Sequence, residues 1–253
     1  MVHFGLIGKN LSHSLSEAYF NKKFDALKLS DYQYNTYDIA HIGEITEIIK
    51  NNTHLKGFNI TIPYKTAILN YVDEIDDEVQ KIGATNTIKI YRQKDNTIKT
   101  KAFNTDHLGF RDSLSAHKNL ETCKALILGT GGAAQAVAFA LTKLNIEFLF
   151  VTRKKKSIPA SVQYHELTEN IITQHTLIIN ATPLGMYPHA DTMPDIPYRY
   201  IGEKHFLFDL VYNPSLTLFL KKGLEQNAYI CNGLNMLYAQ AEYSWKIWMD
   251  ESL

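Results

Sequence analysis

Short apolar runs alternate with amphipathic segments along the whole chain, a pattern typical of strands separated by helices. The runs expected to form strands are His3–Ile7, Tyr34–Tyr37, Gly57–Thr61, Thr87–Tyr91, Ile98–Ala102, Ala125–Leu128, Phe148–Val151, Leu177–Asn180, Phe206–Leu210 and Ala228–Ile230. The segments between them that have helical periodicity include Glu17–Leu29, Gly43–Lys50 and Ala134–Leu144. This alternation predicts an α/β fold with parallel sheets that are covered by helices on both faces.

The strands are too many for one open sheet, so the 253 residues are expected to form two domains. The break is expected in the polar stretch His107–Thr122, which reads HLGFRDSLSAHKNLET. The last helix, Leu234–Met249, carries Tyr243, Trp245 and Trp248, and its apolar face could fold back onto the first domain. The predicted domains are residues 1–105 with 235–253, and residues 106–234.

A glycine-rich turn follows the apolar run Ala125–Leu128. The segment GTGGAAQAVAFALTKL fits the pattern G-x-G-x-x-G/A through Gly129, Gly131 and Ala134. The first glycine allows a tight turn, the second lets a pyrophosphate approach the backbone, and the alanine keeps the helix close to the strand. The helix N-terminus offers N–H groups to the phosphates. With a further strand at Phe148–Val151, the context predicts a dinucleotide-binding domain.

Four consecutive cations, from Arg153 to Lys156, follow this further strand. At this position, about 20 residues past the glycines, an NAD-binding domain places an acidic residue that holds the ribose 2′-hydroxyl. An acid would repel a 2′-phosphate, whereas a guanidinium can clamp it with two hydrogen bonds. The run therefore predicts NADP rather than NAD, bound by Arg153 and one or two of the lysines. A solvated basic turn is the alternative, and it is the expected state of Lys156.

Composition and charge exclude several other classes of protein. The net charge is zero, from 26 basic and 26 acidic residues, which argues against nucleic-acid binding. No apolar run is long enough to span a membrane, and the start MVHFGLIGKN does not resemble a signal peptide. The two cysteines, Cys123 and Cys231, and the histidines show no metal-binding spacing. A reduced, cytoplasmic location without a metal is expected.

Polar side chains gather in short motifs of the N-terminal half, each at the carboxyl end of an expected strand or in the loop after it. These motifs are HSLS (His13–Ser16), NITIPYK (Asn59–Lys65), GATNT (Gly83–Thr87) and NTD (Asn104–Asp106). Ligands of open parallel sheets bind at this edge. The gathering of motifs at one edge predicts a substrate site.

Two of these motifs also have structural interpretations. Ser14 with Glu17 fits an S-x-x-E capping box, although a cap does not explain the second hydroxyl at Ser16. Two hydroxyls beside a helix N-terminus would suit a substrate carboxylate. Pro63 is expected to begin a helix with Lys65 in its first turn, where a lysine opposes the helix dipole. That unfavourable position marks Lys65 as a candidate functional residue.

The remaining polar residues can likewise be explained without a ligand. Asn59 and Thr61 alternate with isoleucines, as they would on an exposed strand face. Asn86 and Asn104 fit ordinary turns, and Asp106 fits a cap for the helix that follows it. Their gathering beside a dinucleotide domain favours a site.

Taken together, the motifs resemble the family of shikimate dehydrogenases, NADP-dependent enzymes of aromatic amino-acid biosynthesis. The match runs in order through GLIGKNLSHSLS, GFNITIPYK, IGATNT, FNTDHLGF, LILGTGGAAQAV, NATPLGMYP, FDLVYNPSLTLFL and NGLNMLYAQAEYSWKIW. It covers essentially the whole chain. The resemblance implies an N-terminal open α/β sandwich for substrate and a C-terminal Rossmann-like domain for NADP. It leaves open whether the chain is a monomer or a homodimer.

The resemblance also implies roles for individual residues. Lys65 matches the catalytic lysine of the family, and Asp106 matches its aspartate partner. The positions that would hold shikimate are Ser14, Ser16, Asn59, Thr61, Asn86, Asp106 and Gln240, with Tyr212 close by. The positions that would hold NADP are Gly129, Thr130, Gly131, Gly132, Ala133, Thr152, Arg153, Lys154 and, at the nicotinamide end, Gly233.

The chain departs from the family pattern in places. Glu17 stands where the family usually has proline, and Gly8–Asn10 reads GKN where GNP is frequent. The usual NRT of the cofactor turn is Thr152, Arg153 and Lys154 here. The asparagine that often stacks on the adenine side is therefore absent, while the arginine that favours NADP is retained.

The implied reaction is the reversible, NADPH-dependent reduction of 3-dehydroshikimate to shikimate. Lys65 would act as the acid/base group, and in the reducing direction its ammonium can donate a proton without a lowered pKa. Asp106 would orient the lysine and accept a substrate hydroxyl, and Ser14 and Ser16 would anchor the carboxylate. The other ring hydroxyls would be read by Asn59, Asn86 and Gln240.

Other functions stay open at this point. A quinate/shikimate dehydrogenase would accept one more hydroxyl next to the carboxylate, and Ser16 does not exclude it. The cationic turn argues against an NAD-linked quinate enzyme. A dehydrogenase of methylene-tetrahydrofolate would need a pocket for a flat pterin rather than hydroxyls and amides. A non-catalytic NADP sensor is disfavoured by the presence of both Lys65 and Asp106.

Overall fold

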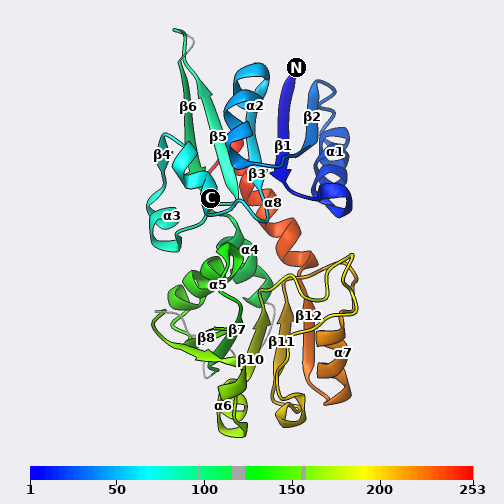
Figure 1. The fold of residues 1–253 in the computed structure, drawn as a ribbon. Helices are drawn as coiled ribbons and strands as arrows, with labels where there is room; N and C mark the ends of the chain where they lie inside the picture. Colours follow the sequence, from blue (N-terminus) through cyan, green and yellow to red (C-terminus); the bar gives the residue numbers. More distant parts are fainter. Residues whose placement is uncertain (96, 116–122, 155–157, 253) are drawn as a thin grey trace. The chain divides into compact units, whose positions relative to one another are not determined.

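The computed structural model describes residues 1–95, 97–115, 123–154 and 158–252. The chain forms two compact units, one of Met1–Leu108 with Tyr238–Leu253 and one of Gly109–Leu237. Each unit has its own six-stranded sheet and its own core (Figure 1). None of the helices in the described part of the chain is long and apolar enough to cross a membrane.

The first unit is built on a mixed sheet with the strand order β2–β1–β3–β5–β6–β4. Its strands are β1 (Val2–Gly8), β2 (Tyr32–Asp38), β3 (Leu55–Ile60), β4 (Glu74–Ile75), β5 (Thr87–Arg92) and β6 (Ile98–Phe103). The first three are parallel, but β5 is antiparallel to both β3 and β6. The prediction of parallel sheets is wrong here, because the few residues from Gln93 to Thr97 allow only a hairpin.

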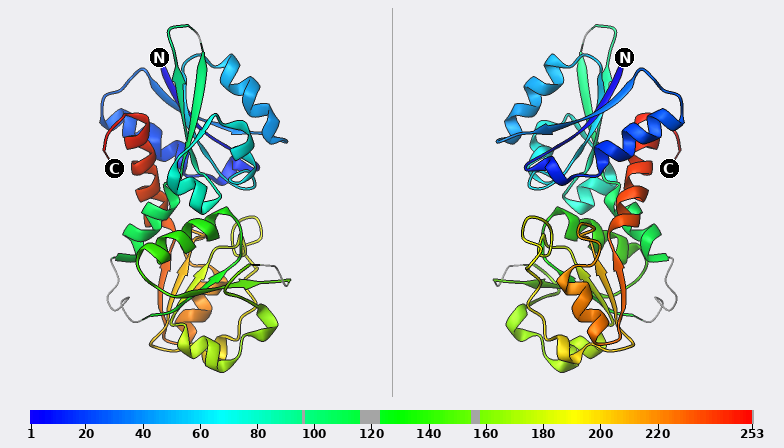
Figure 2. Two further views of the ribbon diagram at one scale, coloured as in Figure 1. Left: turned by 90° about the vertical axis from the view of Figure 1, so that its left-hand side faces the viewer. Right: turned by 90° about the vertical axis from the view of Figure 1, so that its right-hand side faces the viewer.

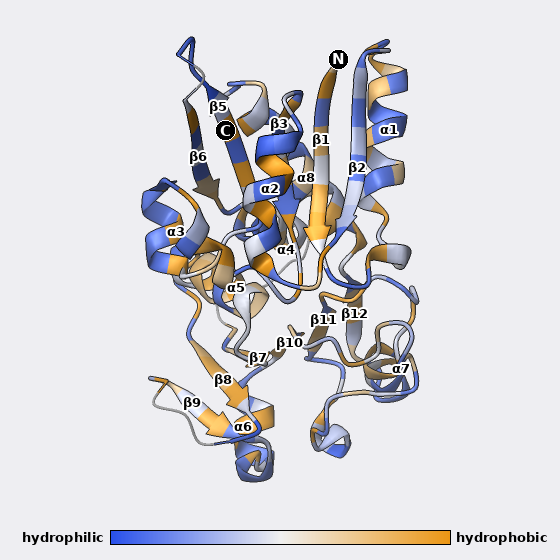
Figure 3. Ribbon diagram, turned by 45° about the horizontal axis from the view of Figure 1, so that its top comes forward, coloured by the Kyte–Doolittle hydropathy of each residue, from blue (hydrophilic) through white to orange (hydrophobic). Residues whose placement is uncertain are grey.

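Helices cover both faces of this sheet (Figure 2). They are α1 (Ser16–Ala26), α2 (Ile45–Asn51), α3 (Asp77–Ile82) and, from Tyr238 on, α8 (Leu234–Trp248), with the 3₁₀ helices η1 (Leu11–His13), η2 (Ile42–Glu44) and η3 (Ala67–Tyr71). Phe4 of β1 packs with Phe20 of α1 and Trp248 of α8 on one face. Ile7 packs with Ile45 of α2 on the other. Figure 3 shows the hydrophobic residues of β1 between helices of mixed hydropathy.

The last helix is seated on the first unit by specific contacts. Trp248 Nε1 donates a hydrogen bond to the carbonyl oxygen of Ile88 at 3.0 Å. A Cβ atom at Gly57 would lie 2.4 Å from the same Nε1 atom, so the absence of a side chain there makes room for the indole. Lys89 Nζ donates to the carbonyl oxygen of Ile247 at 2.8 Å and so satisfies the C-terminal end of the helix.

The second unit has an all-parallel sheet with the order β12–β11–β10–β7–β8–β9. Its strands are β7 (Ala125–Leu128), β8 (Phe148–Thr152), β9 (Ser161–Gln163), β10 (Leu177–Asn180), β11 (Phe206–Asp209) and β12 (Tyr229–Asn232). The order reverses between β7 and β10, as in doubly wound dinucleotide-binding domains. The predicted parallel α/β architecture is confirmed in this unit.

Helices flank this second sheet on both sides. They are α4 (Asp106–Ser115) from Gly109 on, α5 (Gly132–Lys143), α6 (Glu169–Gln174) and α7 (Leu218–Glu225), with the 3₁₀ helices η5 (Tyr164–Glu166) and η6 (Tyr198–Tyr200). Along β7 the side chains alternate, so that Ile127 packs with Val137 of α5 while Leu126 packs with Phe219 of α7. The carboxyl end of β7 then runs directly into the glycine-rich turn.

Candidate active site

An ion pair lies in the first unit, beyond the end of β3. Lys65 Nζ donates to Asp106 Oδ2 at 2.6 Å, and the two side chains are only 16% and 7% exposed. The expectation that Lys65 occupies the first turn of a helix is wrong, because the chain turns at Pro63 and η3 begins only at Ala67. The helix dipole therefore does not mark this lysine. What marks it is a carboxylate partner that is shielded from water.

The Asp106 carboxylate belongs to this pair rather than to a helix cap. At the start of α4 the backbone N–H of His107 donates to Asn104 Oδ1 at 3.3 Å. The interpretation of Asp106 as the cap is therefore wrong, since Asn104 has that role. The second carboxylate oxygen of Asp106, Oδ1, accepts a hydrogen bond from Asn86 Nδ2 at 3.0 Å. Both oxygens are thus engaged, one by a cation and one by an amide.

Two predicted substrate residues extend this chain of hydrogen bonds. Asn86 Nδ2 also donates to Gln240 Oε1 at 3.0 Å. The two amides are 2% and 8% exposed, although they come from the start of β5 and from α8. The structure therefore brings Lys65, Asp106, Asn86 and Gln240 together, in agreement with the grouping expected from the sequence. Their contact with a ligand stays a prediction.

Asn59 adjoins this group from β3 and is turned inward. Its Oδ1 accepts from the Tyr34 hydroxyl at 2.8 Å, and its Nδ2 donates to the carbonyl oxygen of Asn86 at 3.1 Å. The residue is 4% exposed. The alternative of an exposed strand face is therefore wrong for Asn59.

The serines and Thr61 follow the carboxyl ends of β1 and β3. Ser14 Oγ accepts from the N–H of Ser16 at 3.3 Å, and Leu15 occupies the N-cap position of α1. The expected capping box with Glu17 is therefore not formed. Thr61 lies beside the end of β1, since a Cβ at Gly8 would be 2.4 Å from its methyl group. Within the described residues no hydrogen bond joins these side chains to the Lys65 group.

The glycine turn of the second unit is open to a ligand. Gly129 has φ +109°, a conformation that favours glycine, and its N–H donates to the carbonyl oxygen of Val151. A Cβ built at Gly131 meets no atom within 4 Å, and this residue is the N-cap of α5 without a side-chain hydrogen bond. Gly132 and Ala133 form the first turn of that helix, and Thr130 lies between the glycines. An uncapped helix N-terminus beside open space fits a pyrophosphate.

The turn after β8 carries the cations that are expected to select NADP. Thr152 is buried, and its Oγ1 donates to the carbonyl oxygen of Lys154 at 2.8 Å. This bond shapes a turn in which Arg153 and Lys154 are exposed. Lys155 and Lys156, which belong to the same predicted run, lie outside the described residues.

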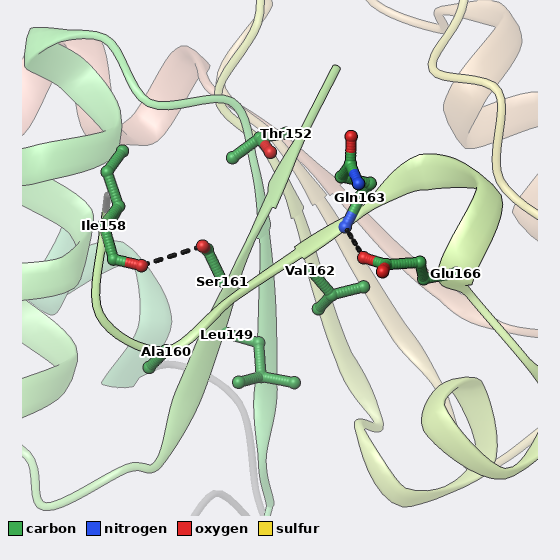
Figure 4. Close-up of a pocket in the computed structure, with 8 residues that line it drawn as sticks. All are labelled: Leu149, Thr152, Ile158, Ala160, Ser161, Val162, Gln163 and Glu166. Carbon is green, nitrogen blue, oxygen red and sulfur yellow. Dashed lines mark hydrogen bonds between the residues drawn. The ribbon is translucent and has the colours of Figure 1, made fainter. Parts of the chain in front are cut away.

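A hollow of about 380 Å³ lies near the same strand end (Figure 4). It is lined by Leu149, Thr152, Ile158, Ala160, Ser161, Val162, Gln163 and Glu166. The Glu166 carboxylate accepts from the N–H of Gln163 at 2.7 Å and gives the lining a negative charge. Because a carboxylate repels a phosphate, the side of the turn with Arg153 fits a 2′-phosphate better than this hollow does.

Two further predicted residues belong to the second unit. Gly233 follows β12, and a Cβ there would lie 2.2 Å from the carbonyl oxygen of Leu210. Close packing therefore accounts for this glycine, and its contact with a nicotinamide stays a prediction. Tyr212 lies in the loop after β11, and its contact with the substrate likewise stays a prediction.

Sequence reasoning missed polar groups that the structure buries around the site. They include the hydroxyls of Thr87, Thr105 and Ser244, all fully buried. In the second unit, it also missed Asp209 at the end of β11, whose pKa burial raises to about 7. A signal did exist for Ser244, since it lies one helical turn after Gln240 and therefore on the same face of α8. In the described part of the chain, no group of three or more histidine, cysteine, aspartate or glutamate side chains could hold a metal ion.

The fold and the site define an α/β protein with one dinucleotide-type unit and one unit that carries a lysine–aspartate pair. Residues 6–88 match the family model described as the shikimate dehydrogenase substrate binding domain. The "Shikimate dehydrogenase (NADP(+))" of Clostridium beijerinckii is 38% identical over 260 residues, which are 99% of this chain and 93% of that protein. The chain therefore belongs to the shikimate dehydrogenase family.

Solved structures show the same relationship. Shikimate dehydrogenase 1 from Peptoclostridium difficile has a TM-score of 0.86 at 36% identity, covering 100% of this chain and 93% of that one. The shikimate 5-dehydrogenase of Thermus thermophilus, solved in complex with NADP(H) and shikimate, has a TM-score of 0.83 at 30% identity. That match covers 99% of this chain and 94% of the other.

Proposed function

We propose that this chain is an NADP-dependent shikimate dehydrogenase, which reversibly reduces 3-dehydroshikimate to shikimate for chorismate and aromatic amino-acid biosynthesis. The names of its relatives support this reaction. The observation that carries the proposal is the shielded ion pair between Lys65 and Asp106, with Nζ and Oδ2 2.6 Å apart. An ammonium group held in one place by a carboxylate is suited to proton transfer at a carbonyl oxygen.

The residues of the first unit would handle the proton and the substrate. Lys65 donates a proton from Nζ to the oxygen of the reduced carbonyl, and the resulting amine recovers a proton from solvent. Asp106 holds the ammonium in place and stabilises its charge. The carboxylate of the substrate is assigned to Ser14 and Ser16, and its hydroxyls are assigned to Asn59, Thr61, Asn86, Asp106 and Gln240, with Tyr212 nearby.

The residues of the second unit would hold the cofactor. The pyrophosphate is assigned to the turn from Gly129 to Ala133 and to the N-terminus of α5. The 2′-phosphate is assigned to Thr152, Arg153 and Lys154, because a guanidinium pairs with phosphate in a forked geometry. Gly233 is assigned to the nicotinamide end. When bound, NADPH supplies the hydride that the protein side chains cannot provide.

The decisive experiment mixes the full chain with shikimate and NADP⁺ and follows absorbance at the nicotinamide band. We expect NADPH to form with shikimate, and to form far more slowly with NAD⁺ in place of NADP⁺. A parallel titration measures binding of NADP⁺. A folded protein that binds NADP⁺ but forms no NADPH would be a sensor and would overturn the proposal.

The same assay distinguishes the related activity on quinate. The ratio of kcat/KM for shikimate to that for quinate is expected to favour shikimate. A ratio near one would make the chain a quinate/shikimate dehydrogenase instead. Cytoplasmic location is also part of the proposal, since Cys123 and Cys231 both remain thiols.

A further inference from the structure

Three hydroxyl groups form a buried cluster behind the ion pair. They belong to Thr87 of β5, Thr105 before α4 and Ser244 of α8, and each residue is 0% exposed. The Ser244 oxygen lies 2.8 Å from that of Thr87 and 3.1 Å from that of Thr105. The two threonine oxygens are 3.3 Å apart. We call these three residues the hydroxyl cluster.

The hydroxyl cluster touches each amide of the site. Thr105 Oγ1 accepts from Asn86 Nδ2 at 2.8 Å, and Thr87 Oγ1 donates to Asn86 Oδ1 at 3.2 Å. Ser244 Oγ accepts from Asn59 Nδ2 at 2.9 Å and donates to the backbone carbonyl of Gln240 at 3.0 Å. No amide that is assigned to the substrate is therefore held by packing alone.

The contacts permit only one orientation of the Asn86 amide. Its Oδ1 accepts from the backbone N–H of Thr105 at 2.7 Å, and a backbone N–H can only donate. Its Nδ2 faces the Asp106 carboxylate, and an ionised carboxylate can only accept. A flipped amide would set donor against donor and acceptor against acceptor.

This orientation is passed on to Gln240. Because Asn86 Nδ2 donates to Gln240 Oε1, the amide oxygen of Gln240 faces the protein interior. Thr105 Oγ1, at 3.4 Å from the same Oε1, reinforces that arrangement. The Nε2 end of Gln240 is then set as a hydrogen-bond donor, which suits an oxygen of a hydroxylated substrate.

The hydroxyl cluster contributes directional hydrogen bonds, which an apolar side chain of the same size could not provide. Valine has nearly the shape of threonine and would fill the same space, but it offers neither a donor nor an acceptor. A buried hydrogen bond adds little net stability, whereas a buried polar group without a partner costs more than that bond adds. The value of these hydroxyls therefore lies in the amide orientations that they enforce together with the backbone N–H of Thr105 and the Asp106 carboxylate.

We propose that Thr87, Thr105 and Ser244 are positioning residues that orient the amides of Asn86 and Gln240, and through Asn86 the Asp106 carboxylate. They thereby select the pattern of ring hydroxyls in the substrate. This inference rests on the proposed function, because it concerns how the same site reads a polyhydroxylated cyclic acid.

The test compares Thr105→Val with Thr105→Ser. Both variants are assayed with shikimate and with shikimate analogues that each lack one ring hydroxyl. In Thr105→Val we expect kcat/KM for shikimate to fall about 10- to 100-fold, the cost of a misplaced group or an unpaired amide. For at least one analogue kcat/KM should fall much less, so that the preference of the enzyme for shikimate over this analogue largely disappears. Thr105→Ser should restore most of the activity and the discrimination.

A control separates positioning from stability. Thr100 of β6 is buried, and its hydroxyl bonds to the Asp73 carboxylate at 2.9 Å, outside the hydroxyl cluster. Thr100→Val should lower Tm without changing kcat/KM or the preference for shikimate. Ser244→Ala repeats the test if Thr105→Val does not fold, and we expect it to lose discrimination in the same sense.

Several results would overturn the inference. If Thr105→Val loses activity on shikimate and all analogues by one common factor, the hydroxyl has a structural role only. The same holds if the valine and serine variants behave alike. When the wild-type chain is active but Thr105→Val matches it, the proposed function stands and this inference alone fails. If the wild-type chain has no activity on shikimate, both the proposed function and this inference are wrong.

Discussion

The two units of the chain build their polar sites from different parts of the polypeptide. In the first unit the site consists of side chains, led by the pair of Lys65 and Asp106. In the second unit the turn that is assigned to the pyrophosphate consists of backbone, because Gly131 leaves open space in front of the N-terminus of α5. Proton transfer and the recognition of hydroxyls need directional side chains, whereas a pyrophosphate is bound well by N–H groups.

The units also differ in how they bury a carboxylate. Asp106 has an ammonium partner in Lys65. Asp209 of the second unit is fully buried, and its donors among the described residues are all neutral, including Asn180 Nδ2 at 2.9 Å and the N–H of Val211 at 3.0 Å. Burial raises the pKa of Asp209 to about 7, although these hydrogen bonds act in the opposite direction. The carboxylate that is assigned to the reaction, Asp106, is thus paired with a cation. Asp209, which has no assigned role in the reaction, is held by neutral hydrogen-bond donors.

The largest effect is expected from removing the ammonium group of the side-chain site. Lys65→Ala should lower kcat by about 10²–10⁴-fold with little change in KM, since a positioned acid/base group contributes on that scale. Steady-state assays in both reaction directions measure this. The matched control is Lys89→Ala, because Lys89 is also buried in the first unit but bonds to the end of α8. In that control Tm should be lower than in the wild type, and kcat should be unchanged. Turnover near the wild-type value in Lys65→Ala would exclude the lysine from the chemistry.

The second unit could be predicted from the sequence more fully than the first. The strands Ala125–Leu128 and Leu177–Asn180 have the predicted bounds, because short apolar runs of a buried parallel sheet are local signals. The glycine turn is local too. In the first unit β5 was predicted as a strand but its antiparallel direction was missed, although the few residues that connect it to β6 do not allow a parallel crossover.

In the candidate site, too, local motifs could be predicted from the sequence, but contacts between distant segments could not. Lys65 and Asp106 were found through their motifs, but the helix-dipole argument for Lys65 and the alternative of a helix cap for Asp106 were both wrong. Asn104 rather than Asp106 accepts a hydrogen bond from the backbone N–H of His107 in α4, and one sequence does not show the turn geometry that decides this. The hydroxyl cluster was missed as a group, because Ser244 meets Thr87 and Thr105 only when α8 folds back onto the first sheet.

The next largest effect concerns the cations of the second unit. Arg153→Ala should weaken NADP⁺ binding about 10- to 100-fold, the worth of a charge-assisted contact to phosphate, and leave NAD⁺ binding unchanged. Titrations with both cofactors measure the two affinities. Lys221→Ala, which removes an exposed cation of α7, serves as the control and should change neither affinity. Equal losses for both cofactors in Arg153→Ala would contradict selection by the 2′-phosphate.

A smaller effect tests whether the second unit binds through its backbone. Gly131→Ala should lower Tm only slightly, since the new methyl group meets no atom within 4 Å and the only cost is the poorer N-cap of α5. NADP⁺ affinity should fall about tenfold, or about 1.4 kcal/mol, because the methyl group stands in the path of the pyrophosphate. The opposite pattern is expected of Gly233→Ala, whose methyl group would lie 2.2 Å from the carbonyl oxygen of Leu210 and would lower Tm. Unchanged cofactor affinity in Gly131→Ala would place the pyrophosphate elsewhere.

The smallest effect on activity is expected from Asp209, because its carboxylate supports the fold of the second unit. An unfolded aspartate has a pKa near 3.9, and the folded group has a pKa of about 7. Between those values the folded state holds a proton that the unfolded state has lost. The free energy of unfolding should therefore decline as pH rises through this window, by at most about 1.4 kcal/mol per pH unit, and level off above it.

Asp209→Asn should remove that decline while leaving kcat at neutral pH close to the wild-type value. An asparagine oxygen can still accept from Asn180 and Val211, and its amide can donate to the Thr217 hydroxyl, which now donates to the carboxylate at 2.5 Å. Urea unfolding at pH 5 and pH 7.5 measures the difference between variant and wild type. Glu225→Gln is the control, because Lys222 lowers the pKa of this exposed carboxyl and so keeps its titration below the window. An identical pH dependence in wild type and Asp209→Asn would show that Asp209 is ionised in the folded chain and that its neutral donors suffice to hold the charge.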